Sequence, residues 1–362
     1  MLSRSFAAVS LASKSRSSSS LALPRRFPTS LPNKPAVPPL KSAAPHFLPV
    51  THEEVGALRR QAFSSPSNDA VALSSDELLK DAQKLKGKVV LITGAGTFDG
   101  FGGQMALAAA KYGAKVVVSD LNEEGVWDVV REITDRGGLA TGVVCDVSNW
   151  YSQVDMFRHA HNTFGQIDVV VANAGIGDND IPLLDETLTD MDEPEKPLLR
   201  CLHIDMIGVI YTAKLAFYHL RRSLVSDVKA FVAVCSVSSY FAFPTQPLYA
   251  ASKHGKSFFH RIFASAKLTL PSSAGVLGLV RALHYDGLEN GIRCNMLAPW
   301  IVDTPSLGPN RAALADVPKG SIDDVVAAMI RASTTEKSGE SFVVDEKGVF
   351  SLPHKSSGYL AK

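Results

Sequence analysis

Three side chains have a spacing that suits proton transfer: Ser236, Tyr249 and Lys253. Tyr249 and Lys253 lie four residues apart, so on a helix their side chains share one face. A free tyrosine has a pKa of about 10, and lowering it by about three units requires roughly 4 kcal/mol in favour of the phenolate. The neighbouring ammonium would contribute to this, and Ser236 could hydrogen-bond a substrate oxygen beside the phenol. The set predicts an acid/base site, and an exposed Tyr–Lys pair on a helix is the alternative.

A glycine-rich turn precedes this set in the sequence "VVLITGAGTFDGFGG", residues 89–103. Gly94, Gly100 and Gly102 would let the backbone approach a pyrophosphate at the N-terminus of the following helix. Asp120 ends the next strand-like run and could accept hydrogen bonds from both hydroxyls of an adenosine ribose, while repelling a 2′-phosphate. Leu121 follows, where an Arg would be needed to pair with that phosphate. We therefore expect NAD as the cofactor and NADP as the less favoured one, and a simple strand-end turn is the alternative role for Asp120.

Two further loops follow apolar runs. Asp146 and Val147 end the third run, and Asn173 begins "NAG" after the fourth. In open α/β sheets ligands bind at the carboxyl ends of the strands, so these residues are expected to line the same cofactor site. The positive charge of an oxidised nicotinamide would there add to that of Lys253 in favouring the phenolate of Tyr249.

Short runs rich in Val and Ile must position these loops. They are "KVVLITG", "KVVVSD", "ATGVVCDV", "IDVVVANAG" and "AFVAVCSVSS", and they lack polar alternation, as is typical of strands buried on both faces. Helical spacing is found between the runs, over 102–112, 122–136, 150–164 and 197–223. The β-α-β-α order predicts an α/β fold with one Rossmann-type, doubly wound parallel sheet and helices on both faces.

We assign residues 87–352 to that domain, 53–86 to a helical or irregular lead-in, and 353–362 to a tail. Residues 1–52 contain seven Lys or Arg and no Asp or Glu, and eight prolines lie between Pro24 and Pro49. This composition is typical of a mitochondrial transit peptide and an unpacked Pro-rich leader, so a mitochondrial (matrix) location is expected, with a cytoplasmic location as the alternative.

Composition excludes several classes of protein. The net charge of +1 argues against nucleic acid as a partner, and no apolar run reaches the roughly 20 residues of a membrane span. The cysteines are far apart and form no C-x-x-C motif, so they are interpreted as reduced core residues, with no metal site expected. They are Cys145, Cys201, Cys235 and Cys294.

Together these motifs resemble the short-chain dehydrogenase/reductase family from about Lys88 to Phe350. The segment "NMLAPWIVDTP" is similar to the family's N-x-x-x-P-G-x-x-x-T pattern. The resemblance implies reversible hydride transfer, with Tyr249 as acid/base, Lys253 lowering its pKa and binding the nicotinamide ribose, and Ser236 polarising the carbonyl. It also implies that Thr304 contacts the cofactor and that the protein forms a homodimer or homotetramer. Within the family, the chain is similar to fungal-type NAD-dependent alcohol dehydrogenases related to 15-hydroxyprostaglandin dehydrogenase.

The chain departs from the family pattern in four places. Five residues rather than three separate Gly94 from Gly100, and "DEKG" replaces the usual Gly-Gly near the C-terminus. Asp205 stands where the family has a catalytic Asn that orients a water in a proton relay. Trp300 replaces the Gly of the P-G pair, either as a wall of an apolar substrate pocket or as a packed loop aromatic.

A twenty-residue segment, 256–275, separates "YAASKHG" from "VLGLVRAL", although the family continues from one directly into the other. We interpret it as a retained, in-frame intron, with a loop insertion as the alternative. Pro271 within it is expected to end the helix that carries Tyr249 and to weaken assembly, so oligomers are expected when the segment is absent.

The sequence therefore predicts an NAD-dependent oxidoreductase that acts on a small, apolar secondary alcohol or ketone. A carbonyl reductase with a different substrate class is one alternative. A nucleotide-binding protein without turnover is another, given Asp205 and the enlarged glycine loop.

Overall fold

The computed structural model describes residues 70–177, 183, 188–223, 226–240, 246–253, 275–308 and 310–352, all within a compact unit that spans Phe47–Lys362. The predicted leader, most of the inserted segment and the predicted tail lie outside the described residues.

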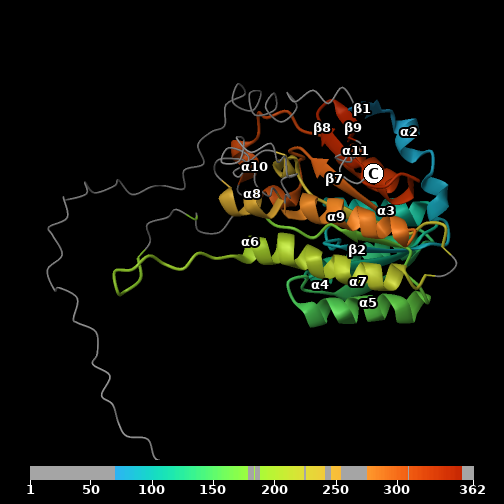
Figure 1. The fold of residues 1–362 in the computed structure, drawn as a ribbon, viewed down its shortest axis with the longest axis horizontal. Helices are drawn as coiled ribbons and strands as arrows, with labels where there is room; N and C mark the ends of the chain where they lie inside the picture. Colours follow the sequence, from blue (N-terminus) through green and yellow to red (C-terminus); the bar gives the residue numbers. More distant parts are fainter. Residues whose placement is uncertain are drawn as a thin grey trace, which may run out of the picture. The chain divides into compact units, whose positions relative to one another are not determined.

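The described residues form one nine-stranded sheet (Figure 1). Its strand order is β1-β9-β8-β7-β6-β5-β2-β3-β4, parallel from β8 to β4 and antiparallel at β9 and β1. The predicted α/β fold and its parallel sheet are confirmed, and each of the five apolar runs contains a strand from β2 to β6. The strands are β1 (Val71–Leu73), β2 (Val89–Thr93), β3 (Lys115–Asp120), β4 (Leu139–Val144), β5 (Val169–Ala172), β6 (Ala230–Val234), β7 (Arg293–Pro299), β8 (Ser341–Asp345) and β9 (Gly348–Leu352).

The central strands are buried on both faces, which explains why their sequences show no polar alternation. In β2, Val89 and Leu91 belong to one hydrophobic core, whereas Val90 and Ile92 belong to another. The first core packs α5 (Trp150–Phe164), α7 (Val209–Leu220) and α9 (Gly275–Glu289) against the sheet. The second packs α2 (Ser75–Leu79), α3 (Phe101–Lys111), α4 (Glu123–Asp135) and α11 (Ile322–Thr334). Helices therefore cover both faces, as the sequence predicts.

Shorter elements make up the rest of the regular structure in the described residues. They are η1 (Ala82–Leu85), α6 (Arg200–Leu202), η2 (His203–Gly208), η3 (Val237–Ser239), α8 (Pro247–Lys253), η5 (Pro305–Leu307) and α10 (Asn310–Ala313). Helix α8 carries Tyr249 and Lys253, and α9 contains the predicted continuation "VLGLVRAL". The two helices contact each other and follow one another in Figure 1.

One helical run among the described residues, Arg200–Leu220, is long and apolar enough to cross a membrane by length and composition. Half of its apolar stretch is buried inside the protein, and its side chains contribute to the first core. Its composition is that of a core helix.

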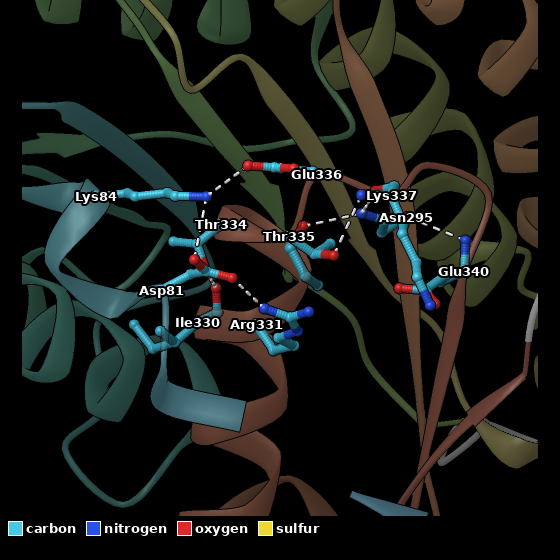
Figure 2. A network of polar contacts seen from close by, with 11 residues as sticks. Asp81, Lys84, Asn295, Ile330, Arg331, Thr334, Thr335, Glu336, Lys337 and Glu340 are labelled. Carbon is cyan, nitrogen blue, oxygen red and sulfur yellow. Dashed lines mark hydrogen bonds and ion pairs between the residues drawn. The ribbon is translucent and has the colours of Figure 1, made fainter. Parts of the chain in front are cut away.

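The lead-in segment is joined to the domain by an ion-pair network (Figure 2). Asp81 binds Arg331 of α11, and Lys84 binds both Asp81, at 3.1 Å, and Glu336, at 3.2 Å. Ser74 and Glu77 form a reciprocal capping box at the start of α2. The described part of this segment, residues 70–86, contains α2 and η1, and also β1, which extends the sheet beyond β9 and was not predicted.

Candidate active site

A cleft of about 590 Å³ opens at the carboxyl ends of β2, β3 and β5 and beside the loop after β4. Its lining includes seven of the residues that the sequence assigns to cofactor binding. These are Gly94, Gly100, Asp120, Asp146, Val147, Asn173 and Thr304, whereas Gly102 packs against Gly94 and does not line the cleft itself. Because the strands are parallel, their carboxyl ends meet at one edge and bring loops distant in sequence into one wall.

The glycine loop leaves no room for side chains at several positions, Gly94 and Gly102 among them. Gly94 has a φ of +67°, and a Cβ there would lie 2.6 Å from Cα of Ala174. A Cβ on Gly102 would collide with the carbonyl oxygen of Gly94 and would lie 2.6 Å from Nδ2 of Asn173. Gly100 begins α3 without a side-chain cap, so the first N–H groups of this helix are available to an anion. The bare loop and the uncapped helix fit a pyrophosphate.

Asn173 lines the cleft and also holds the glycine loop in place. Its Nδ2 donates hydrogen bonds to the carbonyl oxygens of Thr93, at 2.9 Å, and of Gly94, at 2.8 Å. Its backbone N–H donates to Oγ1 of Thr93 at 3.1 Å. The side chain therefore ties the end of β5 to the glycine loop and fixes the width of the cleft between them.

Asp120 lies at the end of β3 with each carboxylate oxygen partly used. Oδ2 accepts a hydrogen bond from the Gly96 N–H at 2.9 Å, and Oδ1 accepts one from the Asn122 N–H at 3.0 Å. Each oxygen retains lone pairs for a further donor such as a ribose hydroxyl. Leu121 lines the cleft beside it and is 68% exposed, so no cation occupies this position to pair with a phosphate.

The loop after β4 is shaped by its own carboxylate. Oδ1 of Asp146 accepts hydrogen bonds from the N–H and the Oγ of Ser148, at 2.8 and 2.7 Å. This turn presents Val147 and the thiol-bearing Cys145 to the cleft. Cys145 was predicted only as a core residue, since nothing in its apolar surroundings in the sequence marks it as facing a cavity.

The three predicted catalytic side chains converge behind this cleft. Lys253 Nζ lies 5.6 Å from the centroid of the Tyr249 ring, and Ser236 is within hydrogen-bonding reach of the phenol. Ser236 also caps η3, its Oγ accepting the Ser238 N–H at 3.1 Å. Gly175 connects this set to the cleft: it lines the cleft, and a Cβ on it would lie 3.4 Å from Lys253 Nζ. The Tyr–Lys pair is therefore not the exposed helix pair that was the alternative.

Asp205 is the fourth member of this group. It lies in η2, a π-helical turn between α6 and α7, and its side chain is fully buried. Oδ2 forms an ion pair with Lys253 Nζ at 3.0 Å, and Oδ1 accepts the Ile176 N–H at 2.8 Å. π-turns within helices are frequent at functional sites because they redirect a side chain from its regular position.

In the free protein, burial and Asp205 oppose the effect of Lys253 on the phenol. Burial raises the pKa of the Tyr249 phenol above its usual value, Lys253 and a hydrogen bond from Ser236 oppose this, and Asp205 adds to the increase. Burial alone would lower the pKa of Lys253, but the Asp205 carboxylate and the neighbouring phenol and thiol raise it instead. In the free protein the phenol is thus less acidic than an ordinary tyrosine, mainly because it is buried and in part because Asp205 opposes the effect of the ammonium.

Trp300 is a packed loop aromatic. It is 6% exposed, belongs to the first core, and donates its Nε1–H to the carbonyl oxygen of Pro318 at 3.0 Å. The alternative in which it walls a substrate pocket is not what the structure shows. All four cysteines are buried thiols that form no disulfide, and among the described ranges no cluster of His, Cys, Asp or Glu could hold a metal ion.

Comparison with known proteins places this geometry in a family. The family model described as short chain dehydrogenase matches residues 88–267. The 5'-hydroxyaverantin dehydrogenase of Dothistroma septosporum is 29% identical over 295 residues, which cover 75% of this chain and 89% of that protein. The cis-4-hydroxycyclohexanecarboxylate dehydrogenase of Sinomonas cyclohexanicum is 31% identical, over 60% of this chain and 74% of that protein.

A solved structure supports the same assignment. The 7 alpha-hydroxysteroid dehydrogenase complexed with NADH and 7-oxo glycochenodeoxycholic acid superposes with a TM-score of 0.58 at 25% identity, over 75% of this chain and 97% of that one. The fold, the cleft and these relatives lead to one conclusion: the chain belongs to the short-chain dehydrogenase/reductase family, whose members are oxidoreductases that act on CH–OH groups with a nicotinamide cofactor.

Proposed function

We propose that this protein transfers a hydride between NAD and a secondary alcohol or ketone, with Tyr249 as the acid/base. The observation that carries the proposal is the position of Gly175, which lines the dinucleotide cleft and lies beside Lys253, since a Cβ on it would be 3.4 Å from Nζ. A substrate carbon in the cleft beside Gly175 would have its oxygen near both the phenol and the cofactor.

The fit to the dinucleotide rests on the bare glycine loop and the uncapped N-terminus of α3. When bound, the nicotinamide accepts or supplies the hydride. Asp120 would hold the adenosine ribose, Thr304 would contact the nicotinamide end, and Lys253 would bind the nicotinamide ribose. Because Asp120 is a carboxylate that no cation accompanies at Leu121, we propose NAD rather than NADP.

The side chains of the chain itself would manage the proton. In the direction of reduction, the Tyr249 hydroxyl donates its proton to the carbonyl oxygen while Ser236 hydrogen-bonds the same oxygen. In the direction of oxidation, the phenolate accepts the proton of the alcohol. The raised pKa of the phenol supports the reductive direction, and hence the carbonyl reductase alternative, at neutral pH.

An apolar substrate is the class to test first. The relatives named above include a hydroxysteroid and a hydroxycyclohexanecarboxylate dehydrogenase, which supports an alcohol borne on a carbon ring. A panel of cyclic secondary alcohols and their ketones, with NAD or NADH, is the matching screen.

The decisive experiment replaces Tyr249 by Phe. Turnover should fall by at least about 100-fold, the usual contribution of general acid–base catalysis, while NADH affinity should stay the same. Tyr151→Phe is the matched control, because Tyr151 lies on α5 and is 76% exposed. Retained activity in Tyr249→Phe would reassign the proton donor. NADH binding without turnover in the unchanged chain would favour the nucleotide-binding alternative, which the buried Asp205–Lys253 pair supports.

The exposed faces of two helices suggest how the protein assembles. Ile210 and Tyr218 on α7, with Tyr285 and Leu288 on α9, are exposed apolar side chains, from 37% to 59%. We propose that these two helices contact a second copy and that deleting residues 256–275 strengthens the dimer or tetramer. Size-exclusion chromatography of both forms tests this, and equal elution would contradict it. For location, residues 1–52 fused to a fluorescent protein should direct it to mitochondria.

A further inference from the structure

Asp205 and Lys253 form a buried pair whose charges offset each other. Their side chains are 0% and 4% exposed, and their charged atoms lie 3.0 Å apart. The Ile176 N–H, at 2.8 Å, holds the second carboxylate oxygen in place. The contact is thus fixed on both sides, since one partner is set by a π-helical turn and the other by α8.

The groups around the phenol come from several elements. Lys253 lies on the same helix, Asp205 on η2, Cys201 on α6, and Cys235 and Ser236 follow β6. Burial raises the pKa of Cys235 to about 11, so this thiol is neutral at physiological pH. Within the described part of the chain, the full charges that act on the phenol are therefore those of Lys253 and Asp205.

We infer that Asp205 is a positioning residue that cancels the charge of Lys253 at Tyr249, and so keeps the phenol protonated and ready to donate its proton to a carbonyl. This inference rests on the proposed function of Tyr249. It assigns to this chain a preference for carbonyl reduction at neutral pH, and alcohol oxidation that increases only at alkaline pH.

The size of the effect follows from the geometry. Lys253 Nζ is 5.6 Å from the ring centroid and 3.0 Å from Asp205, so the carboxylate lies within about 9 Å of the ring. At an effective dielectric constant of about 20, a unit charge at that distance shifts the pKa by about one unit or more. Asp205→Asn removes the charge with almost no change in shape. The midpoint of Tyr249 ionisation should therefore fall by about one pH unit or more.

The test measures that midpoint directly on the full chain. The ultraviolet absorbance of tyrosinate is titrated in the unchanged protein and in Asp205→Asn, each compared with its partner carrying Tyr249→Phe, so that the difference reports Tyr249 alone. Asp205→Ser is the second neutral variant, should the first fail to fold. Asp227→Asn is the control, because it removes the carboxylate of an exposed Lys–Asp pair, at 2.5 Å from Lys88.

The expected result is a lower midpoint in Asp205→Asn or Asp205→Ser and an unchanged one in Asp227→Asn. The inference is also supported if Tyr249 does not titrate before unfolding in the unsubstituted protein but does titrate in Asp205→Asn. An equal or higher midpoint in both Asp205 variants, or no titration before unfolding in either of them, would overturn the inference.

A kinetic arm separates this inference from the proposed function. The pH profiles of kcat/KM for reduction and oxidation should both move to lower pH in Asp205→Asn, by the shift seen in the titration. Titration needs no substrate, so a shifted midpoint in a protein without turnover would contradict the proposed function alone. Turnover with unshifted profiles and an unshifted midpoint would contradict the inference alone.

Discussion

Gly102→Ala is the perturbation that most directly tests the glycine loop as a dinucleotide site. The added methyl group would collide with the carbonyl oxygen of Gly94 and would lie 2.6 Å from Nδ2 of Asn173 and 2.9 Å from Cα of Ala95. Two of these three neighbours are backbone atoms, which cannot rotate away. Either the loop moves into the cleft, or α3 moves away from the sheet.

The cost of such overpacking is about 1 to 3 kcal/mol. If the loop moves, this strain must be overcome whenever the cofactor binds, and the Kd for NADH should rise by about 5- to 150-fold. If α3 moves, the same energy destabilises the fold, and Tm should fall by roughly 2 to 12 °C for a domain of this size. Because the same methyl group causes both effects, the losses of binding free energy and of folding free energy should together add up to about 1 to 3 kcal/mol.

NADH fluorescence titration and thermal unfolding measure the two parts. Gly137→Ala is the matched control: its φ is +81°, and no atom lies within 4 Å of the added methyl. It should lower Tm through backbone strain of about 1 to 2 kcal/mol and leave NADH affinity unchanged. If Gly102→Ala binds NADH as tightly as the unchanged protein and unfolds at the same temperature, the close packing of this loop is not what forms the site.

Three further outcomes are expected. Asp168→Ala should destabilise the fold by about 3 kcal/mol or more in urea unfolding, because the buried carboxylate accepts the Val89 N–H at 2.8 Å and the Ser223 hydroxyl at 2.9 Å, and both would lose their partner. Burial, with smaller effects of nearby cations, lowers the pKa of His219 to about 4. As the pH falls, this imidazole is therefore protonated in the unfolded chain before it is protonated in the folded protein. The contribution of His219 to the free energy of unfolding should be fully present above about pH 6.5 and should be lost towards pH 4, by roughly 1 to 2 kcal/mol for this half-buried ring. His219→Asn should remove that part of the pH dependence. Asp120→Ala should weaken NADH by about 10-fold and leave NADPH affinity equal or improved, as measured by fluorescence.

Matched controls keep these outcomes specific. Asp155→Ala removes a carboxylate that is 67% exposed on α5 and should change stability by less than about 1 kcal/mol. An equally small loss in Asp168→Ala would show that its hydrogen bonds are replaced by water. A pH dependence that persists in His219→Asn would assign it to another group, and an equal loss for both cofactors in Asp120→Ala would remove the basis for NAD preference.

The sequence predicted the sheet and the cofactor cleft well for a physical reason. Strands buried on both faces need uninterrupted Val and Ile, and parallel strands deliver the residues that follow them to one edge. Asp120, Asp146 and Asn173 could therefore be assigned to one cleft from their positions after such runs, although their hydrogen bonds could not. Asn173 in particular binds the glycine loop, a contact that depends on the spacing of β2 and β5.

Features that depend on distances across the fold were not predictable. The acidity of Tyr249 was expected to increase beside Lys253 and an oxidised nicotinamide, but in the free protein burial raises the pKa of the phenol, and Asp205, which the π-turn in η2 brings to 3.0 Å from the ammonium, adds to this increase. Trp300 could be assigned to a substrate wall or to packing until its hydrogen bond to Pro318 was known. Strand β1 has three residues, two of them exposed, so it has no apolar pattern to detect.

That short strand has a consequence for how the protein can be shortened. By pairing with β9, β1 covers backbone N–H and C=O groups that could otherwise pair with a strand of another molecule. Cleavage of the chain at any site within residues 1–52 leaves β1 in place. Cleavage after Leu73 would remove β1 and expose the edge of β9. The protein should then be prone to self-association and precipitation.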